Sequence, residues 1–582
     1  MLNFFGFISK DKKHKKNISK IYKHYSKIKK ENNYLDKNIY LLNYKLKITD
    51  LTKYKDEYII LYSGVLYNKN ELKKLLQKNN FFLNEETDEE IILLLYIIFK
   101  EKMLNYLNGI FSIVIYEKSS NRFFLARDPL GIKSLFYTLS SKNYKFIFSS
   151  SLKRILQYSK FKREIDEESL IELFNINSFY IYGKTYFKDI FELKAGSFAY
   201  YENGVFSQKE YYTFHIKKID LDKNKIINNI KKIAENNSKN IINLDKNICI
   251  KKENDLISNT FLEFLKSKYK DIPSYTVDYV KKYKITFNNN YEKENNINVL
   301  IDNIYLFDKI KKIINTLAIP FFADTSVSTI GLYDTIKRNN FDAIISNDFF
   351  NPLNFIFLND NIIDLKFNLI NKELINEKEI QTYKENYIKN IFTNLSTKNL
   401  NKKEINIAKN IYLNLMHYIS IISSNTTKIA NEFEIEVINQ YFDINLFNYI
   451  INILFTLNTQ SGIQNIENEY KNDIYKNLIQ EIFSYNISNF LINKNSFNLK
   501  LNYSNDYISL LENKLLDIIN DSNSKLNKVI DKNFLKKIII CHGENLYYND
   551  INPLISYPEF LAHLIQIDMW IEEYNIKFNF KN

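Results

Sequence analysis

The chain has 582 residues, of which 45% are hydrophobic and 25% charged, and a formal net charge of +13 at neutral pH. These proportions are typical of soluble globular proteins and exclude fibrous, collagen-like and fully disordered chains. The chain has no run of about 18 uncharged apolar residues, so we expect no membrane span. Its first charges follow a short apolar stretch, which is the reverse of a signal peptide, and we expect a cytoplasmic protein.

Residues 1–212 are predicted to form a β-rich layered domain with helices on its faces. Acidic residues followed by a long apolar run predict a helix over residues 87–101, because carboxylates stabilise the first turn. A second helix is predicted over residues 166–177. Short segments rich in β-branched and aromatic residues predict strands over residues 58–67, 109–118, 122–128 and 144–151.

Residues 213–582 are predicted to form a parallel sheet flanked by helices. Helical spacing covers long stretches such as 306–319, and residues 370–540 are predicted to be mainly helical with loops near 394–406 and 493–505. The apolar run at 536–540 is predicted to be a strand. Short apolar segments predict further strands over residues 247–250, 274–279 and 341–346.

Glycine, cysteine and histidine are too scarce for several kinds of site. Seven of the ten glycines lie within residues 1–204, and the other three stand alone. A loop that wraps a phosphate needs several closely spaced glycines, so no such loop is predicted after residue 205. Cys249 and Cys541 exclude a disulfide framework, and the six scattered histidines have no metal-binding spacing, so no metal site is predicted.

The net positive charge is compatible with nucleic-acid binding. However, the chain is also rich in Asn, Lys and Ile, which share A/T-rich codons, and a biased genome explains much of the same charge. We therefore keep a basic nucleic-acid-binding protein only as a subsidiary hypothesis.

Five segments occur in the order and spacing of one enzyme family. The start, MLNFFGFI, resembles M-C-G-I-F-G-F-I of class II glutamine amidotransferases. Residues 107–137 resemble the L-N-G-x-F…A-R-D-x-x-G-I-K-P-L-Y segment of asparagine synthetases, and residues 148–156 and 185–196 resemble segments that follow it. Residues 560–574 are similar to the carboxy-terminal L-W-x-x-x-x-L-E-x-W segment. The chain is identified as a divergent member of the glutamine-dependent (class B type) asparagine synthetase family.

The resemblance implies an α/β fold of two domains. Residues 1–212 would form the αββα sandwich of class II (Ntn-type) glutamine amidotransferases, and residues 213–582 a helix-rich α/β synthetase domain like the ATP-pyrophosphatases. The family hydrolyses glutamine at an amino-terminal cysteine, adenylates a carboxylate with ATP and Mg²⁺, and lets ammonia displace AMP. It commonly dimerises, which implies a homodimer or a mixed dimer with a paralogue.

The glutamine site implied by the resemblance is degenerate. Leu2 stands in place of the nucleophilic cysteine and has no nucleophilic atom. The substrate segment N-G-E-I-Y-N has become Ser63-Gly64-Val65-Leu-Tyr-Asn, so an amide has become a hydroxyl and a carboxylate has become an apolar side chain. Lys45 replaces the arginine that grips the substrate carboxylate and lacks its bidentate fork.

Some polar residues of the family's sites survive. Asp88 and Glu90 remain, either as substrate-binding acids or as charges at a helix start. The phosphate loop S-G-G-L-D-S-S has lost its glycines and serines, and only Asp255 matches its metal-binding acid. In the motif S-G-D-G-G-D-E, Ser346 and Asp348 remain, but the glycines and the D-E pair are gone. The later motif M-A-x-x-x-E-x-R-x-P-F-L-D keeps Asp443.

The losses concentrate at sites, whereas the matching segments are strands, turns and a packing helix. This pattern favours a catalytically inactive pseudoenzyme without cofactors, acting as a scaffold partner of an active synthetase or a tailoring enzyme. The alternative is an amide-forming ligase that uses ATP and Mg²⁺ but lacks glutaminase activity, similar to asparagine synthetase, lasso-peptide cyclases or β-lactam synthetases.

Overall fold

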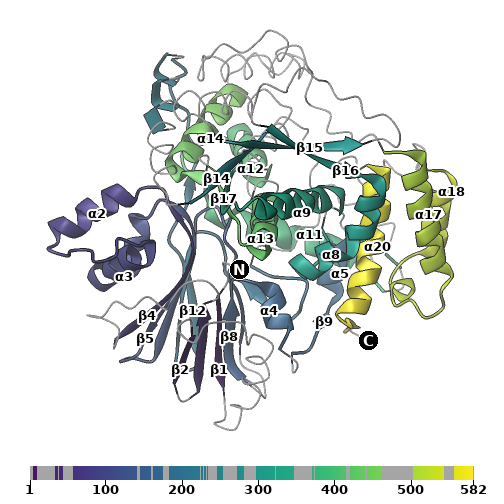
Figure 1. The fold of residues 1–582 in the computed structure, drawn as a ribbon, viewed down its shortest axis with the longest axis horizontal. Coiled ribbons are helices and arrows are strands. Elements are labelled where there is room, and N and C mark those ends of the chain that lie inside the picture. The colour runs from purple at the N-terminus through teal and green to yellow at the C-terminus, as the bar shows by residue number, and fades with distance from the viewer. Residues whose placement is uncertain are drawn as a thin grey trace.

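The computed structural model describes residues 4–9, 33–36, 38–43, 57–139, 144–158, 161–174, 183–222, 224–226, 228–230, 232–233, 246–252, 272–280, 296–321, 323–346, 370–371, 374–375, 377–414, 420–439, 442–459, 503–542 and 556–580. Figure 1 shows a β-rich part at the lower left and a helix-rich part, built around a second sheet, above it and to its right. Within these ranges, no helix is long and apolar enough to cross a membrane.

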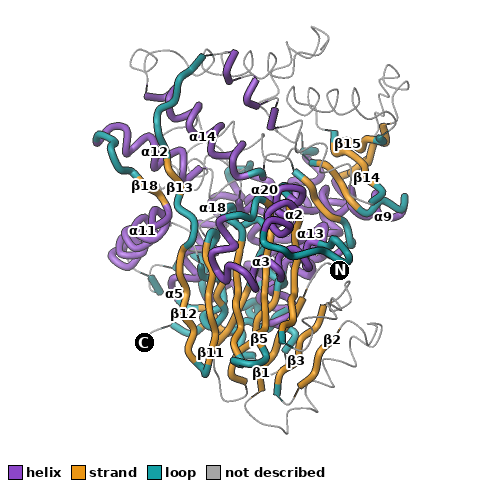
Figure 2. Tube along the Cα trace, turned by 90° about the vertical axis from the view of Figure 1, so that its left-hand side faces the viewer, coloured by secondary structure: helices purple, strands orange, loops and turns teal. Residues whose placement is uncertain are grey.

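Two antiparallel sheets pack face to face in the β-rich part, and Figure 2 shows their strands running side by side. One sheet has the order β10-β7-β8-β1-β3-β2 and the other β12-β11-β6-β5-β4. Alternate side chains of both sheets, such as Phe4, Val114 and Phe123, fill the space between them and are at most 1% exposed. The strands are β1 Phe4–Ser9, β2 Asn33–Asp36, β3 Ile39–Asn43, β4 Tyr58–Leu66, β5 Gly109–Glu117, β6 Arg122–Arg127, β7 Phe136–Leu139, β8 Tyr144–Ser149, β10 Phe191–Glu192, β11 Ser197–Glu202 and β12 Val205–Glu210.

Helices cover the outer faces of both sheets. Apolar side chains of α3 pack on the outer face of β4, β5 and β6, and Thr87 caps α3 by accepting a hydrogen bond from the Glu90 amide at 3.2 Å. On the other sheet, Phe5 and Phe7 of β1 share a core with α4 and α5. The helices are α2 Lys69–Lys78, α3 Asp88–Phe99, η3 Lys100–Asn105, α4 Leu152–Leu156 and α5 Glu167–Phe174.

A five-stranded parallel sheet lies at the centre of the helix-rich part, in the order β16-β15-β14-β17-β19. Its strands are β14 Ile248–Lys251, β15 Ser274–Val280, β16 Asn296–Asp302, β17 Ala343–Ile345 and β19 Glu436–Ile438. The helices around it are α8 Asn303–Leu317, α9 Ala323–Arg338, α11 Glu377–Ile391, η6 Phe392–Asn394, α12 Lys402–Asn414, α13 Ser420–Glu432, α14 Ile444–Thr459, α17 Asn505–Asn520, η10 Leu526–Lys528, α18 Lys532–Ile540 and α20 Tyr557–Glu573.

Packing between the two parts is extensive. One apolar cluster contains Val65 of β4, Ile110 of β5, Ile345 of β17 and Ile438 of β19. Helix α20 adds a second contact, because Trp570 packs edge-on against Tyr186 and Phe187. Two short parallel pairs also join distant segments: β13 Phe214–His215 with β18 Leu395–Ser396, and β9 Glu164–Ile165 with β20 Lys577–Phe578.

The predicted α/β fold with two domains is confirmed, as are the seven predicted strands within 58–151 and 247–346. Two local predictions were wrong. Residues 536–540 belong to helix α18, whose Asp531 cap accepts hydrogen bonds from the amides of Asn533 and Phe534 at 3.0 Å. The predicted loop at 394–406 contains strand β18 and the start of α12.

Candidate functional site

The structure describes five of the predicted site residues. Ser63, Gly64 and Val65 lie on β4, Asp88 begins α3, and Ser346 directly follows β17. The predictions for the other positions fall outside the described residues, namely Leu2, Lys45, Asp255 and Asp348.

Gly64 sits where β4 and β5 approach closely. It pairs with Phe111, and a Cβ at this position would lie 2.2 Å from the Ile110 carbonyl oxygen. Such a contact is far below van der Waals distance, so only glycine fits without moving the β5 backbone. The close approach of β4 and β5 therefore requires a glycine at position 64, whether or not a substrate binds.

Val65 occupies the position at which the family motif has a glutamate. Its side chain is 5% exposed and belongs to the apolar cluster with Ile110, Ile345 and Ile438. A carboxylate here would need a charged partner, and valine instead contributes to packing between the two parts. The position has no group that can bind an ammonium.

The carboxylate of Asp88 is bound within the protein. One oxygen lies 3.2 Å from Lys69 Nζ, and the other accepts hydrogen bonds at 3.2 Å from the Tyr62 hydroxyl and the Leu66 amide. Lys69 thus neutralises the charge that would hold a substrate amine, while the other contacts anchor α3 to β4. This geometry supports a structural role for Asp88.

Of two neighbouring glutamates, Glu90 was predicted with Asp88 as a surviving acid of the family's glutamine site, whereas Glu89 was not. Glu90 is 1% exposed, and its carboxylate accepts hydrogen bonds from the amides of Asn84, Glu85 and Glu86 at 2.7, 2.9 and 2.9 Å. It therefore fixes the turn before α3. Glu89 is 7% exposed, and burial, followed by the nearby charge of Asp88, raises its pKa to about 7.

Glu89 is expected to make the protein less stable as pH rises from about 4.5 to 7. Over this range the folded state holds a proton on Glu89 that the unfolded state has released, so the free energy of unfolding falls by about 3 kcal/mol. Glu89→Gln should remove this fall in denaturant unfolding measured from pH 4 to 8. Glu71→Gln, on the exposed start of α2, is the control, and an unchanged pH slope in Glu89→Gln would contradict the assignment.

The carboxyl edge of the parallel sheet differs from a phosphate-binding loop. The Lys252 amide donates a hydrogen bond to the Tyr275 carbonyl at 2.8 Å, so the chain continues its pairing with β15 where the family motif has its glycines. On β17, Ser346 is 1% exposed and its amide donates to the Ile438 carbonyl at 3.0 Å. Both amides are used by the sheet, whereas a phosphate site needs amides that face the ligand.

Polar contacts between the parts involve residues of the family's motifs. Asn108, from the L-N-G segment, donates to Asp443 at 2.9 Å and accepts from the Ile444 amide at 3.1 Å. The other Asp443 oxygen caps α14 through the amides of Asn445 and Leu446, at 2.9 and 3.1 Å. Asp443 thus docks the β-rich part onto the start of α14.

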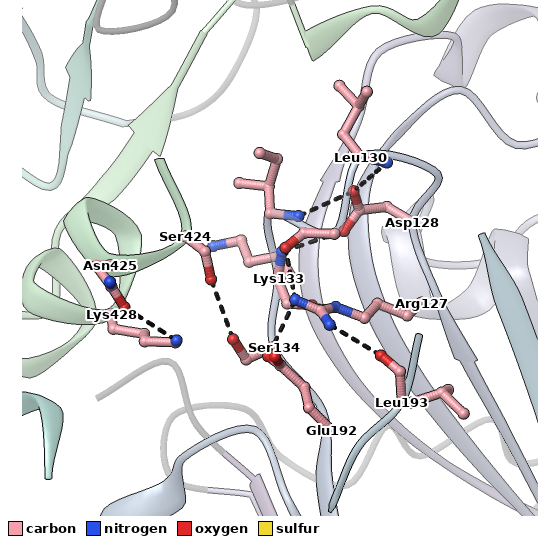
Figure 3. Close-up of polar contacts among 12 residues, drawn as sticks. Arg127, Asp128, Leu130, Lys133, Ser134, Glu192, Leu193, Ser424, Asn425 and Lys428 are labelled. Atoms are coloured by element: carbon pink, nitrogen blue, oxygen red, sulfur yellow. Dashed lines mark hydrogen bonds and ion pairs between the residues drawn. The ribbon is translucent and has the colours of Figure 1, made fainter. Parts of the chain in front are cut away.

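The segment that follows β6 is held by Arg127 and Asp128 (Figure 3). The Arg127 guanidinium donates to the carbonyls of Gly131, Lys133 and Leu193 at 2.6 to 2.8 Å and lies 3.0 Å from Glu192. Such multiple charge-assisted contacts define one loop conformation. The carboxylate of Asp128 accepts at 3.1 Å from the amides of Leu130, Ile132 and Lys133.

Comparison with known proteins connects these features. Residues 1–212 match a protein family that is described as a glutamine amidotransferase domain. Asparagine synthetase [glutamine-hydrolyzing] 3 of Bacillus subtilis (strain 168) is 21% identical over 568 residues, which cover 90% of this chain and 88% of that protein. The chain is therefore similar to an asparagine synthetase over most of its length, as its motifs predicted. Asparagine synthetase [glutamine-hydrolyzing] 1 of the same organism is 28% identical over 180 residues, or 31% of this chain and 28% of that protein.

A solved structure of glutamine phosphoribosylpyrophosphate amidotransferase from B. subtilis, complexed with ADP and GMP, also matches, with 10% identity and a TM-score of 0.25. The match covers 47% of this chain and 65% of that one. A structure of the allosteric regulatory enzyme of purine biosynthesis gives 11% identity and a TM-score of 0.25, over 55% of this chain and 72% of that one.

The sequence has no arginine in the later asparagine synthetase motif, but the residue that stands in its place was not identified there. Counted from Ile429, the arginine of M-A-x-x-x-E-x-R falls at Glu436, which reverses the charge. Glu436 is 5% exposed and forms an ion pair with Lys246 Nζ. The sequence already contained a signal for this change. A glutamate at a motif position that has an arginine in the family indicates that the groups around that position have also changed.

Proposed function

We propose that this member of the asparagine synthetase family is a non-catalytic scaffold that binds another protein. The observation that carries the proposal is the burial of Val65 in the apolar cluster with Ile345 and Ile438, where a glutamine site would need a carboxylate. Asp88 supports it, because Lys69 already neutralises its charge. The sequence also supports it, because Leu2 stands at the position of the nucleophilic cysteine and has no nucleophilic atom.

The second active site supports the same proposal. The Lys252 amide is paired in the sheet, and the segment after β14 lacks the glycines that a triphosphate requires. The partner we propose is an active asparagine synthetase paralogue in a mixed dimer, or a tailoring enzyme. Such a role requires the fold and its surface, and both survive the loss of catalytic groups.

Calorimetry of the full chain with Mg-ATP is expected to show no binding, and incubation with glutamine should release no glutamate. Leu2→Cys should leave the glutaminase result unchanged, because the groups that hold the substrate amine are also missing. Micromolar affinity for Mg-ATP, together with pyrophosphate release in the presence of an acid and an amine, would favour the ligase without glutaminase activity. Recovery of glutaminase in Leu2→Cys would contradict the proposal for the first site.

A further inference from the structure

Charged groups of the two parts meet where strands β4 and β19 share a buried apolar cluster, a contact that we call the β4–β19 junction. Glu436, at the start of β19, is 5% exposed. On β4, the Tyr62 hydroxyl donates a hydrogen bond at 3.2 Å to Asp88, at the start of α3. Burial raises the pKa of this hydroxyl, and the charges of Asp88, Glu89 and Glu436 raise it further. Two carboxylates of the β-rich part and one of the helix-rich part therefore lie near the same hydroxyl.

Two of the three carboxylates have a lysine as partner. Lys69 Nζ lies 3.2 Å from Asp88, and Lys246 Nζ forms an ion pair with Glu436. Burial lowers the pKa of the second ammonium, but the charges of Glu436, Asp88 and Asp342 together raise it. Asp342 has a further lysine 3.7 Å away, on α9. Lys246 is therefore the cation that links the acids of the two parts.

Glu89 is the carboxylate that remains without a cation of its own. The residue is 7% exposed, and no described lysine or arginine forms an ion pair with it. The charged groups that act on it are Asp88 on α3, Lys69 on α2 and Glu436 on β19. Lys69 is already paired with Asp88, and burial lowers the pKa of Lys133, the other lysine near Glu436. An ionised Glu89 would therefore add a buried charge that no partner at the junction neutralises.

The charge of Glu436 makes the helix-rich part sensitive to Glu89. Glu436 stands where the asparagine synthetase motif has an arginine, so an acid replaces a cation at this position. An arginine would attract an ionised Glu89, whereas a glutamate repels it. The charge reversal therefore couples a proton held by the β-rich part to a strand of the helix-rich part.

We propose that the β4–β19 junction is a pH-sensitive contact, in which a proton on Glu89 keeps α3 docked beside β19 and loss of the proton loosens it. With the proton in place, the carboxylates of Asp88 and Glu436 face the ammonium groups of Lys69 and Lys246. Without it, a third carboxylate is buried beside them, which is unfavourable. Because the pKa of Glu89 is raised to about 7, the contact is tight at lower pH and weakens as the pH rises through this value. This response does not depend on the scaffold role.

Hydrogen exchange of the full chain, followed by mass spectrometry, tests the proposal, because it reports on single segments whereas global unfolding does not. Protection of α3 and β19 should fall about tenfold between about pH 6 and about pH 8.5, since the docked state holds a proton that the open state releases near pH 4.5. Glu89→Gln should abolish this fall. Glu168→Gln is the matched control, because it changes a 45% exposed acid in the first turn of α5 and should leave the fall intact.

Glu436→Gln tests whether the proton is felt across the junction. It removes a repulsive charge on the other part, so the fall in protection should be clearly smaller than in the wild type. If the unpaired Lys246 prevents folding, the double variant Glu436→Gln with Lys246→Met removes both members of the ion pair and still removes the repulsion. Helix α20 should keep its protection at both pH values. A fall that persists in Glu89→Gln, is unchanged without the Glu436 charge, or extends equally to α20 would overturn the proposal.

Discussion

Trp570→Ala is expected to lower the free energy of unfolding by about 3–5 kcal/mol, the range for removing a large buried aromatic side chain. The side chain is fully buried, with ring centres 6.1 Å from Tyr186 and 5.5 Å from Phe187. Its indole Nε1 donates to the Ala318 carbonyl at 2.8 Å, at the end of α8. The residue thus connects α20, α8 and the β-rich part, and its removal leaves a cavity where all three meet.

Trp570→Phe separates packing from hydrogen bonding at this position. It keeps most of the apolar contact but leaves the Ala318 carbonyl without its indole donor, so we expect a smaller loss, about 1–3 kcal/mol. Both variants lack the only tryptophan of the chain, and unfolding is therefore followed by circular dichroism in denaturant. Equal unfolding midpoints for the two variants would show that the ring volume contributes little.

The prediction of strands succeeded where local and tertiary preferences agree. The segment at 109–118 is rich in β-branched and aromatic residues, and it forms a strand that is buried on both faces. Residues 247–250 and 341–346 pair as neighbours in the parallel sheet. The run at 536–540 failed because three consecutive isoleucines fit a buried helix as well as a strand. Asp531 was the available signal, since an aspartate before KNFLKK is typical of a helix N-cap.

The sequence allowed the candidate site to be predicted only as a set of motif positions whose functional residues are replaced. Replacement of a glutamate by Val65 is visible in the sequence, but its contact with Ile438 joins residues that are far apart in the chain. The neutralisation of Asp88 depends on Lys69 at the start of a different helix, which no motif includes. Charges such as Lys133 and Glu436 acquire their meaning from burial, and burial depends on how the two parts pack.

Val65→Glu, which restores the residue of the family motif, is expected to destabilise the protein by about 3–5 kcal/mol. The new carboxylate would lie among the side chains of Ile110, Ile345 and Ile438, none of which can pair with it, and an uncompensated buried charge has a cost of this size. Denaturant unfolding of the variant and the wild type at pH 7 measures the difference.

Val65→Gln is the matched control, because it has the size of glutamate without the charge. If charge dominates, Val65→Gln should lose clearly less stability than Val65→Glu, and the Glu variant should regain stability as pH falls and its carboxylate is protonated. If both variants are as stable as the wild type at every pH, Val65 does not lie in a closed apolar contact. A penalty confined to the charged variant would show that the contact between β4 and the parallel sheet excludes a carboxylate at the position where the family motif has a glutamate.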